Sequence, residues 1–303
     1  MEVKKIAVKK IVVPTDFSEQ ARAAYPAAVA LARSFGASLS LAHVMEAIPP
    51  LSYLHERGIE TGLPQNSFTD EYRAFLEEER RRPELSGVAV STRLVCNAHP
   101  HDGLNQAIRE EEGDLVFLGP HGHSTLGYAV LGSFTSKAVR YARVPVYTYR
   151  AEDGAVPPQR ILVPYDFSES SVAILPAARY LAETLGALLT FLHVVDAFPL
   201  AAGPLDIEKD HASVMNLAER IAERAQERFE SLREETLGGL ECDFRVRRGH
   251  TVHEIIETVK EKESDLVLAS THGWTGWKHL LLGSIAEKLV RKAPCSVMTV
   301  RPR

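Results

Sequence analysis

The stretch KIVVPTDFSE at residues 10–19 decides the fold, because it returns as RILVPYDFSE at residues 160–169. In both copies a short apolar run ends at a proline and is followed by aspartate, phenylalanine and serine. Further motifs return in the same order, about 150 residues later each time: Ala42-His43-Val44 as Leu192-His193-Val194, Asp114-Leu115-Val116 as Asp265-Leu266-Val267, and Leu131-Gly132-Ser133 as Leu282-Gly283-Ser284. An offset of this size matches the usual length of one domain. The chain is therefore a tandem duplication.

The boundary between the copies is expected at residues 151–159, where Gly154, Pro157 and Pro158 interrupt helical and strand patterns. The predicted domains are residues 1–150 and 151–303, with this short linker between them. Because the linker is short, we expect the copies to pack together.

Each copy alternates short apolar strands with helical segments. Strands are expected at residues 10–14, 38–44, 88–96, 114–119 and 144–149, and again at 160–164, 187–195, 242–247, 265–270 and 296–300. Runs that are apolar on both faces are typical of parallel strands covered by helices. The predicted fold class is α/β, with two tandem doubly wound five-stranded parallel sheets of Rossmann-like type. Ligands of such sheets bind beyond the carboxyl ends of the strands.

Helical patterns fill the intervals between the strands. Ser18 and Ser168 stand where N-caps are expected, and the helices that follow should end near Gly36 and Gly186. In the second copy one apolar stripe recurs at helical spacing and predicts a buried helix face. Its members are Val214, Leu217, Ile221, Ala225, Phe229 and Leu232.

Glycines follow the fourth expected strand of each copy at the same spacing. The first copy has Gly119, Gly122 and then Gly132-Ser133, and the second has Ser270, Gly273 and then Gly283-Ser284. Glycine allows backbone N–H groups to approach a phosphate, and the start of the next helix favours an anion. Neither copy has the GxxxxGK[ST] pattern or a GxGxxG after its first strand. A P-loop ATPase and a standard dinucleotide dehydrogenase are therefore disfavoured.

Asp16 and Asp166 directly follow the first strand of each copy, where a carboxylate could accept hydrogen bonds from ribose hydroxyls. The residues before them, Pro14-Thr15 and Pro164-Tyr165, would present backbone groups to a base. Val44 and Val194 end the second strand and are placed to contact the base.

Structural interpretations stay open for the same residues. The glycines could be turn and cap residues only, and both aspartates could be helix caps. His43 and His193 lie inside apolar strands and are interpreted as core residues bonded to a backbone group. His99, His101, His121 and His123 all follow strands, but only His121 is repeated, as His272, so a zinc site is disfavoured.

The ordered motifs resemble those of the universal stress protein family. These motifs are PTDFS or PYDFS after the first strand, His-Val in the second, and Gly-x-x-Gly, nine residues and Gly-Ser before the last helix. The likeness covers nearly the whole chain twice, as in tandem-domain members of the branch that binds ATP. It implies an adenine nucleotide alpha hydrolase-like fold, with the two aspartates at the ribose and the two valines at the adenine. The other residues that it implies at the nucleotide are Pro14, Thr15, Gly119, His121, Gly122, Gly132, Ser133, Phe134 and Thr135, and Pro164, Tyr165, Ser270, His272, Gly273, Gly283, Ser284 and Ile285.

Two positions depart from this pattern. Residue 270 is serine where the motif has its first glycine, and Pro120 removes one N–H group from the first loop.

Composition excludes several classes of partner. The formal charge of −5 gives no basic face for nucleic acid, and no run of about 18 apolar residues predicts a membrane span. Three cysteines without CxxC spacing suit the cytoplasm.

Arg80-Arg81-Arg82, after Glu77–Glu79, is interpreted as a solvated helix end. Residues 47–70 and 197–211 are expected to be connections that form rims over the pockets or between protomers.

The expected ligand is ATP, or ADP or AMP, with Mg²⁺ as an option on the phosphates. Fast hydrolysis is not expected, because neither Gly-x-x-Gly turn contains a lysine, an arginine or an acidic residue, and no catalytic residue is predicted. An ATPase or self-phosphorylating enzyme, modified at Ser133, Thr135 or Ser284, and an interaction module with degenerate nucleotide sites remain alternatives. Residues 144–149 are expected to pair with residues 296–300, which would form an intramolecular pseudo-dimer. Alternatively, these strands would meet those of a second chain in a homodimer.

Overall fold

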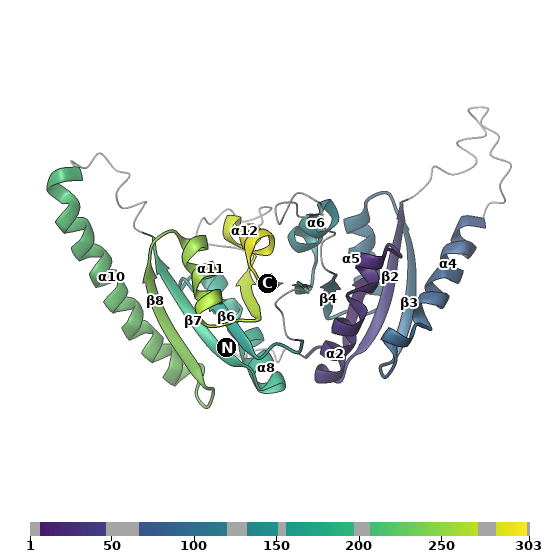
Figure 1. The fold of residues 1–303 in the computed structure, drawn as a ribbon, viewed down its shortest axis with the longest axis horizontal. Coiled ribbons are helices and arrows are strands. Elements are labelled where there is room, and N and C mark those ends of the chain that lie inside the picture. The colour runs from purple at the N-terminus through teal and green to yellow at the C-terminus, as the bar shows by residue number, and fades with distance from the viewer. Residues whose placement is uncertain are drawn as a thin grey trace. The chain divides into compact units, whose positions relative to one another are not determined.

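The computed structural model describes residues 7–46, 67–119, 132–150, 156–196, 207–271 and 283–301. These residues form two compact units (Figure 1). One unit contains the described residues of 8–146, and the other contains Ala7 and the described residues from Tyr147 onward. Within the second unit, Thr148 Oγ1 donates to the Val297 carbonyl at 3.0 Å and the Arg150 N–H donates to Ser296 Oγ at 3.1 Å.

The first half is a parallel sheet with helices between its strands. Its strands are ordered β3-β2-β1-β4-β5. In chain order its elements are β1 (Lys10–Pro14), α1 (Glu19–Arg22), α2 (Tyr25–Phe35), β2 (Ser38–Glu46), α4 (Ser67–Arg80), η1 (Pro83–Leu85), β3 (Val90–Asn97), α5 (Pro100–Glu110), β4 (Leu115–Leu118), α6 (Ser133–Tyr141) and β5 (Val146–Thr148).

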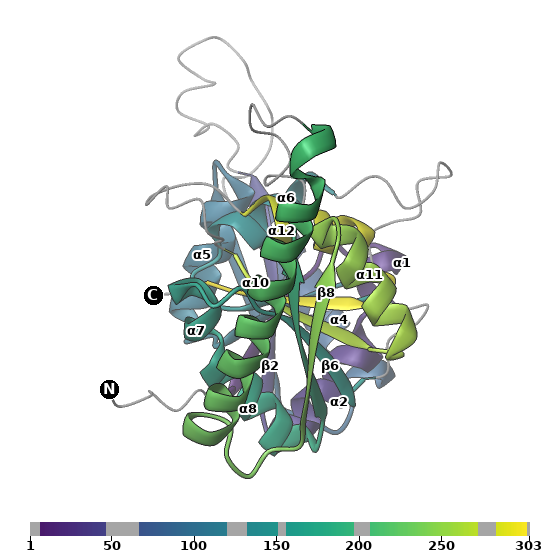
Figure 2. The same ribbon diagram turned by 90° about the vertical axis from the view of Figure 1, so that its left-hand side faces the viewer.

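The second half repeats this arrangement with the order β10-β9-β6-β7-β8. Its elements are β6 (Arg160–Pro164), α7 (Glu169–Ala173), α8 (Leu175–Leu185), β7 (Leu188–Val195), α10 (Ile207–Glu235), β8 (Cys242–Arg248), α11 (Thr251–Glu261), β9 (Leu266–Ser270), α12 (Ser284–Lys292) and β10 (Ser296–Val300). Helix α10 lies along β8 and β7 (Figure 2). The predicted α/β fold with two tandem parallel sheets is confirmed.

Burial explains why these segments form central strands. Ile11, Val12 and Val13 in β1 are at most 1% exposed, as are Ile161, Leu162 and Val163 in β6. Strands that are apolar on both faces need helices on both sides. In α10, Ala225 and Phe229 are buried, which confirms the predicted stripe in that part of the helix. The side chains of Val214 and Leu217 lie outside the described residues.

The strand order reverses beside the first strand of each half. β1 pairs with β2 on one side and with β4 on the other, and β6 pairs in the same way with β7 and β9. The chain therefore leaves β1 and β4 on either side of a topological switch point, where doubly wound sheets bind ligands.

Two expectations about helices need correction. The alanine-rich segment after the first strand is a short helix and a longer one, because Pro26 and Pro176 lack the N–H needed to continue the first helix and stand in the opening turn of the second. The expected connections are also shorter, because α4 begins at Ser67 and α10 at Ile207. The rest of both connections, with the proposed rims, lies outside the described residues.

Candidate functional site

The turn after the first strand is held by backbone hydrogen bonds. The Thr15 N–H donates to the Ala42 carbonyl at 2.9 Å, and its copy, the Tyr165 N–H, donates to the Leu192 carbonyl at 2.8 Å. Both N–H groups are therefore occupied, and contact of the other backbone groups of Pro14-Thr15 and Pro164-Tyr165 with a base stays a prediction. Pro14 and Pro164, one residue earlier, are half-buried at the ends of their strands.

The histidines of the second strand fix the same turn. His43 Nδ1 lies 2.8 Å from the Thr15 carbonyl, and His193 Nδ1 lies 2.9 Å from the Tyr165 carbonyl. A carbonyl only accepts, so each Nδ1 carries the proton. The interpretation of both histidines as core residues bonded to the backbone is confirmed. Burial lowers the pKa of His193.

The phenylalanine two residues after Thr15 or Tyr165 has a strained backbone conformation in both halves. Phe17 and Phe167 adopt φ values of +64° and +60°, in the left-handed region that few residues other than glycine enter. Each ring packs on the histidine of its own half, with centroids 4.7 and 5.2 Å apart. Such strain often marks a functional turn. The sequence offers no signal for it beyond the repetition of the phenylalanine.

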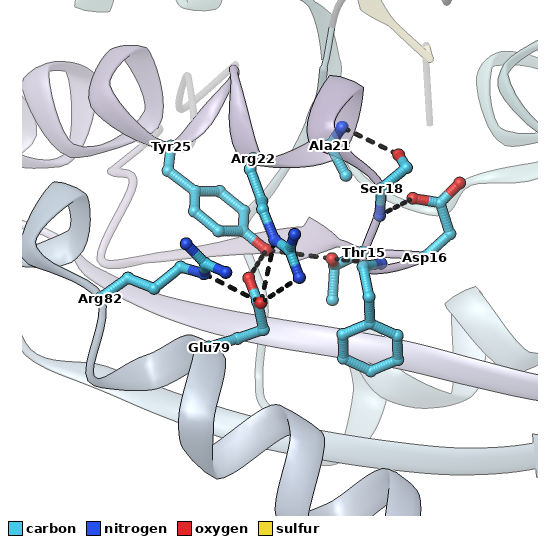
Figure 3. Close-up of polar contacts among 9 residues, drawn as sticks. Thr15, Asp16, Ser18, Ala21, Arg22, Tyr25, Glu79 and Arg82 are labelled. Atoms are coloured by element: carbon cyan, nitrogen blue, oxygen red, sulfur yellow. Dashed lines mark hydrogen bonds and ion pairs between the residues drawn. The ribbon is translucent and has the colours of Figure 1, made fainter.

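Asp16 and Asp166 are exposed at this turn, but neither caps a helix. Ser18 and Ser168 are the N-caps, as predicted, and each serine oxygen accepts a helical N–H. The Ser18 N–H donates to Asp16 Oδ1 at 3.0 Å (Figure 3), and the Ser168 N–H donates to Asp166 Oδ1 at 3.0 Å. The cap interpretation of the aspartates is therefore wrong, and among the described residues their Oδ2 atoms accept no hydrogen bond.

Gly119, the residue directly after β4, has a packing role. A Cβ at Gly119 would lie 3.1 Å from Ala24 Cβ and 3.2 Å from the Gln20 carbonyl. The helices after β1 therefore approach the end of β4 more closely than a side chain allows. At the matching place in the second half, Ser270 ends β9.

Gly132 has no such contact among the described residues. Its φ is −53°, and within that part of the chain a Cβ there would meet nothing nearer than Thr135 Oγ1 at 4.0 Å. It occupies the N-cap of α6, and Gly283 occupies the N-cap of α12 with a φ of −54°. The unpaired N–H groups of a helix start favour an anion, and glycine leaves them open.

The helices that follow place the remaining predicted residues. Ser133 and Ser284 are exposed, Phe134 is half-buried, Thr135 is buried, and Ile285 is 38% exposed. The Gly283 N–H donates to the Thr271 carbonyl at 2.6 Å, so the two ends of the second glycine loop meet. His121, Gly122, His272 and Gly273 lie outside the described residues.

The valines of the second strand are half-buried. Val44 Cγ1 lies 2.3 Å from the place where a Cβ of Gly103 would stand, so Val44 packs on α5. Contact of Val44 or Val194 with a base stays a prediction.

A buried polar cluster that the sequence did not reveal supports the turn of the first half (Figure 3). Glu79 accepts from Arg22 at 2.7 Å, from Arg82 at 2.9 Å and from Tyr25 Oη at 3.1 Å. Because Tyr25 donates its proton to Glu79, Thr15 Oγ1 donates to Tyr25 Oη, at 3.0 Å. Burial raises the pKa of Tyr25 to about 12. Burial alone would raise the pKa of Glu79, but the hydrogen bonds outweigh it and the pKa is lowered.

The interpretation of Glu77–Glu79 and Arg80–Arg82 as a solvated helix end is therefore partly wrong. Glu79 is 3% exposed because it faces the sheet, whereas Glu77 and Arg80 pair at the surface. In the second half the five positions of the cluster are occupied, at the offset of 150, by apolar or aromatic residues: Tyr165, Val172, Leu175, Phe229 and Leu232. Comparing the copies position by position would have signalled the cluster.

The histidines after the third strand do not form a metal site in the described part of the chain. The His101 ring packs on Tyr141, with centroids 4.9 Å apart, and lies 5.8 Å from His99. Among the described residues no three histidine, cysteine or acidic side chains gather in a metal-binding group. His121 and His123 lie outside the described residues. None of the described helices is long and apolar enough to span a bilayer.

Two doubly wound parallel sheets in tandem, each with an aspartate turn after its first strand and a glycine-capped helix after its fourth, define a duplicated Rossmann-like α/β protein. The model of the universal stress protein family matches residues 7–150 and 158–301, and the chain belongs to this family.

Relatives of similar length match about seven-tenths of this chain. A universal stress protein of Mycolicibacterium smegmatis is 28% identical over 224 residues, which cover 73% of this chain and 71% of the relative. The universal stress protein E homolog of Haemophilus influenzae is 26% identical and covers 71% of each chain. The crystal structure of a universal stress protein from Archaeoglobus fulgidus matches with a TM-score of 0.68 at 18% identity, over 97% of this chain and 98% of that one. That likeness supports the fold.

Proposed function

We propose that each half binds an adenine nucleotide, ATP or its products ADP and AMP, and that the chain acts as a nucleotide-dependent stress or regulatory protein. The ribose would meet Asp16 or Asp166, and the phosphates would meet the N-terminus of α6 or α12. Gly132 carries the proposal, because neither its φ nor its packing against the described residues requires glycine, yet it is the N-cap of the helix that follows β4.

Slow or absent turnover is part of this proposal. Charge stabilisation at the γ-phosphate and a positioned base or water would be needed for fast hydrolysis. The turns at residues 119–122 and 270–273 contain no lysine, arginine or acidic residue. Mg²⁺ would then be held mainly by the phosphates. A turnover assay on the purified chain distinguishes this protein from an ATPase.

Aspartate at the two N-caps tests phosphate binding without breaking the fold. Gly132→Asp and Gly283→Asp should leave the melting temperature unchanged or raised, because aspartate is a favoured N-cap and suits the helix dipole. The added carboxylate repels phosphates, so we expect each variant to lose ATP binding in its own half, reducing the stoichiometry by one per chain in calorimetry. Gly132→Asn and Gly283→Asn are matched neutral caps of similar size. ATP bound with equal affinity by the aspartate variants and the unmodified chain would refute the proposal.

A further inference from the structure

The two candidate ribose carboxylates differ in how much of their hydrogen-bonding capacity the protein already uses. In the first half, Asp16 Oδ1 accepts one hydrogen bond among the described residues, from the Ser18 N–H at 3.0 Å. In the second half, Asp166 Oδ1 accepts three. The Ser168 N–H donates at 3.0 Å, the Ser168 hydroxyl donates at 2.5 Å, and the Ser171 hydroxyl also donates.

Ser171 supplies one of the two additional donors, and the Ser168 hydroxyl supplies the other. Ser171 is 5% exposed, and its oxygen also accepts the Asp166 N–H at 3.2 Å, so it binds both the backbone and the carboxylate of the aspartate. Its counterpart in the first half, 150 residues earlier, is Ala21, which has no hydroxyl group. There the Ala21 N–H simply donates to Ser18 Oγ at 3.1 Å.

An ionised carboxylate offers about four acceptor positions, two on each oxygen. Three donors more than fill the two positions of Asp166 Oδ1, and among the described residues Oδ2 accepts no hydrogen bond. Asp16 keeps capacity on both oxygens. A ribose presents two adjacent hydroxyl groups, which can bind a carboxylate through both of its oxygens or through one.

We propose that the two halves recognise the sugar of the nucleotide differently. Asp16 binds the 2′,3′-diol with both carboxylate oxygens, whereas Ser171 restricts Asp166 to one oxygen, so the second half discriminates less against nucleotides that lack these hydroxyls. Ser171 is a positioning residue that sets sugar specificity through Asp166. This inference rests on the proposed function, since it concerns the same two sites.

Calorimetry on the full chain separates the halves when one site is closed. With Gly283→Asp the first half reports, and with Gly132→Asp the second half reports. In each background the readout is the ratio of the dissociation constants of 2′,3′-dideoxy-ATP and ATP. One additional hydrogen bond to a charged group predicts a ratio about ten times larger in the first half than in the second.

Reciprocal substitutions test the role of Ser171. Ser171→Ala gives the second half the same aspartate, serine and alanine as the first, and should raise its ratio toward that of the first half. Ala21→Ser should lower the ratio of the first half. A purely structural effect of either change would weaken both ligands equally and leave the ratio unchanged.

The outcomes distinguish the two proposals. If ATP binds in both halves but the ratios are equal and neither substitution moves them, the inference about Ser171 is overturned and the proposed function stands. If ATP binds in neither half, the proposed function fails and this inference fails with it.

Discussion

Glu79 binds two guanidinium groups and a phenol while only 3% of its side chain is exposed. Removing one partner of a buried ion pair leaves the other charges without compensation. We expect Glu79→Gln to lower the free energy of unfolding of the first half by about 2–3 kcal/mol, less than for a fully buried pair because Arg22 and Arg82 are about one-third exposed. Hydrogen exchange of peptides from the first half measures this loss.

The control for that variant is Glu78→Gln on the same turn, where the side chain is exposed and the change should lie within about 0.5 kcal/mol. The second half also suggests a rescue, since it carries apolar residues at all five positions of the cluster. Replacing the whole cluster by those residues should restore most of the stability. Equal losses for Glu79→Gln and Glu78→Gln would contradict the importance of the cluster.

Site residues with a local cause were predictable from the sequence. Each serine cap was predictable because the serine oxygen bonds an N–H group only three residues later. The role of the histidines was predictable from their place inside an apolar strand. The contacts of the cluster were not predictable from the first copy alone, because Tyr25 and Glu79 lie 54 positions apart and meet only when α4 packs on the sheet. The left-handed φ of Phe17 depends on tertiary contacts in the same way.

Among the elements, the end of β4 and the helices after β1 approach each other most closely at Gly119. A side chain there would overpack the contact, which usually costs about 1–3 kcal/mol. Gly119→Ser should therefore destabilise the first half by that amount, as measured by its unfolding midpoint in urea.

The second half supplies the matched comparison for this contact. Ser270 already carries a side chain at the corresponding place, so the second half accommodates a Cβ there and Ser270→Ala should not overpack it. If Gly119→Ser were as stable as the unmodified chain, the observed glycine would reflect ligand approach alone.

Strand positions were predicted closely. β1, β6 and β10 agree residue for residue, and the other strands agree within two residues at each end. Apolar runs flanked by polar residues define such strands locally. β4 begins one residue later than expected, after Asp114, whose carboxylate accepts the N–H groups of Lys9 and Lys10 at 2.8 and 3.0 Å. The loops of the candidate site have no comparable periodicity.

For the whole molecule, the two halves should respond differently to acid. Burial lowers the pKa of His193, so the folded second half disfavours its protonation. The unfolded chain takes up that proton more readily, and stability is lost as the pH falls below about 6.5. In the first half the pKa values of Glu79 and Glu111 are lowered, because hydrogen bonds and cations outweigh burial. Their stabilisation is present above about pH 4.3 and is lost as the pH falls through their folded values.

We therefore expect the second half to lose stability first when the pH is lowered. His193→Gln should remove the loss between about pH 6.5 and 5, because glutamine can donate to the Tyr165 carbonyl without titrating. Burial raises the pKa of Asp265, so this residue changes stability with pH in the opposite sense to His193. Asp265 is present in both the unmodified chain and the His193→Gln variant, so it does not affect their difference. Hydrogen exchange at several pH values gives the profile of each half. A first half that opens before the second would contradict this order.

The strand order also has a consequence during synthesis on the ribosome. β1 is made first, yet it lies between β2 and β4, and Asp114 lies 104 residues after Lys10. At about 5–20 residues per second, one inner neighbour of β1 emerges only some 5–20 s after β1 itself. During that interval an apolar strand edge is open to other nascent chains. Chaperones that shield such edges should therefore be needed most while residues 15–114 are being translated.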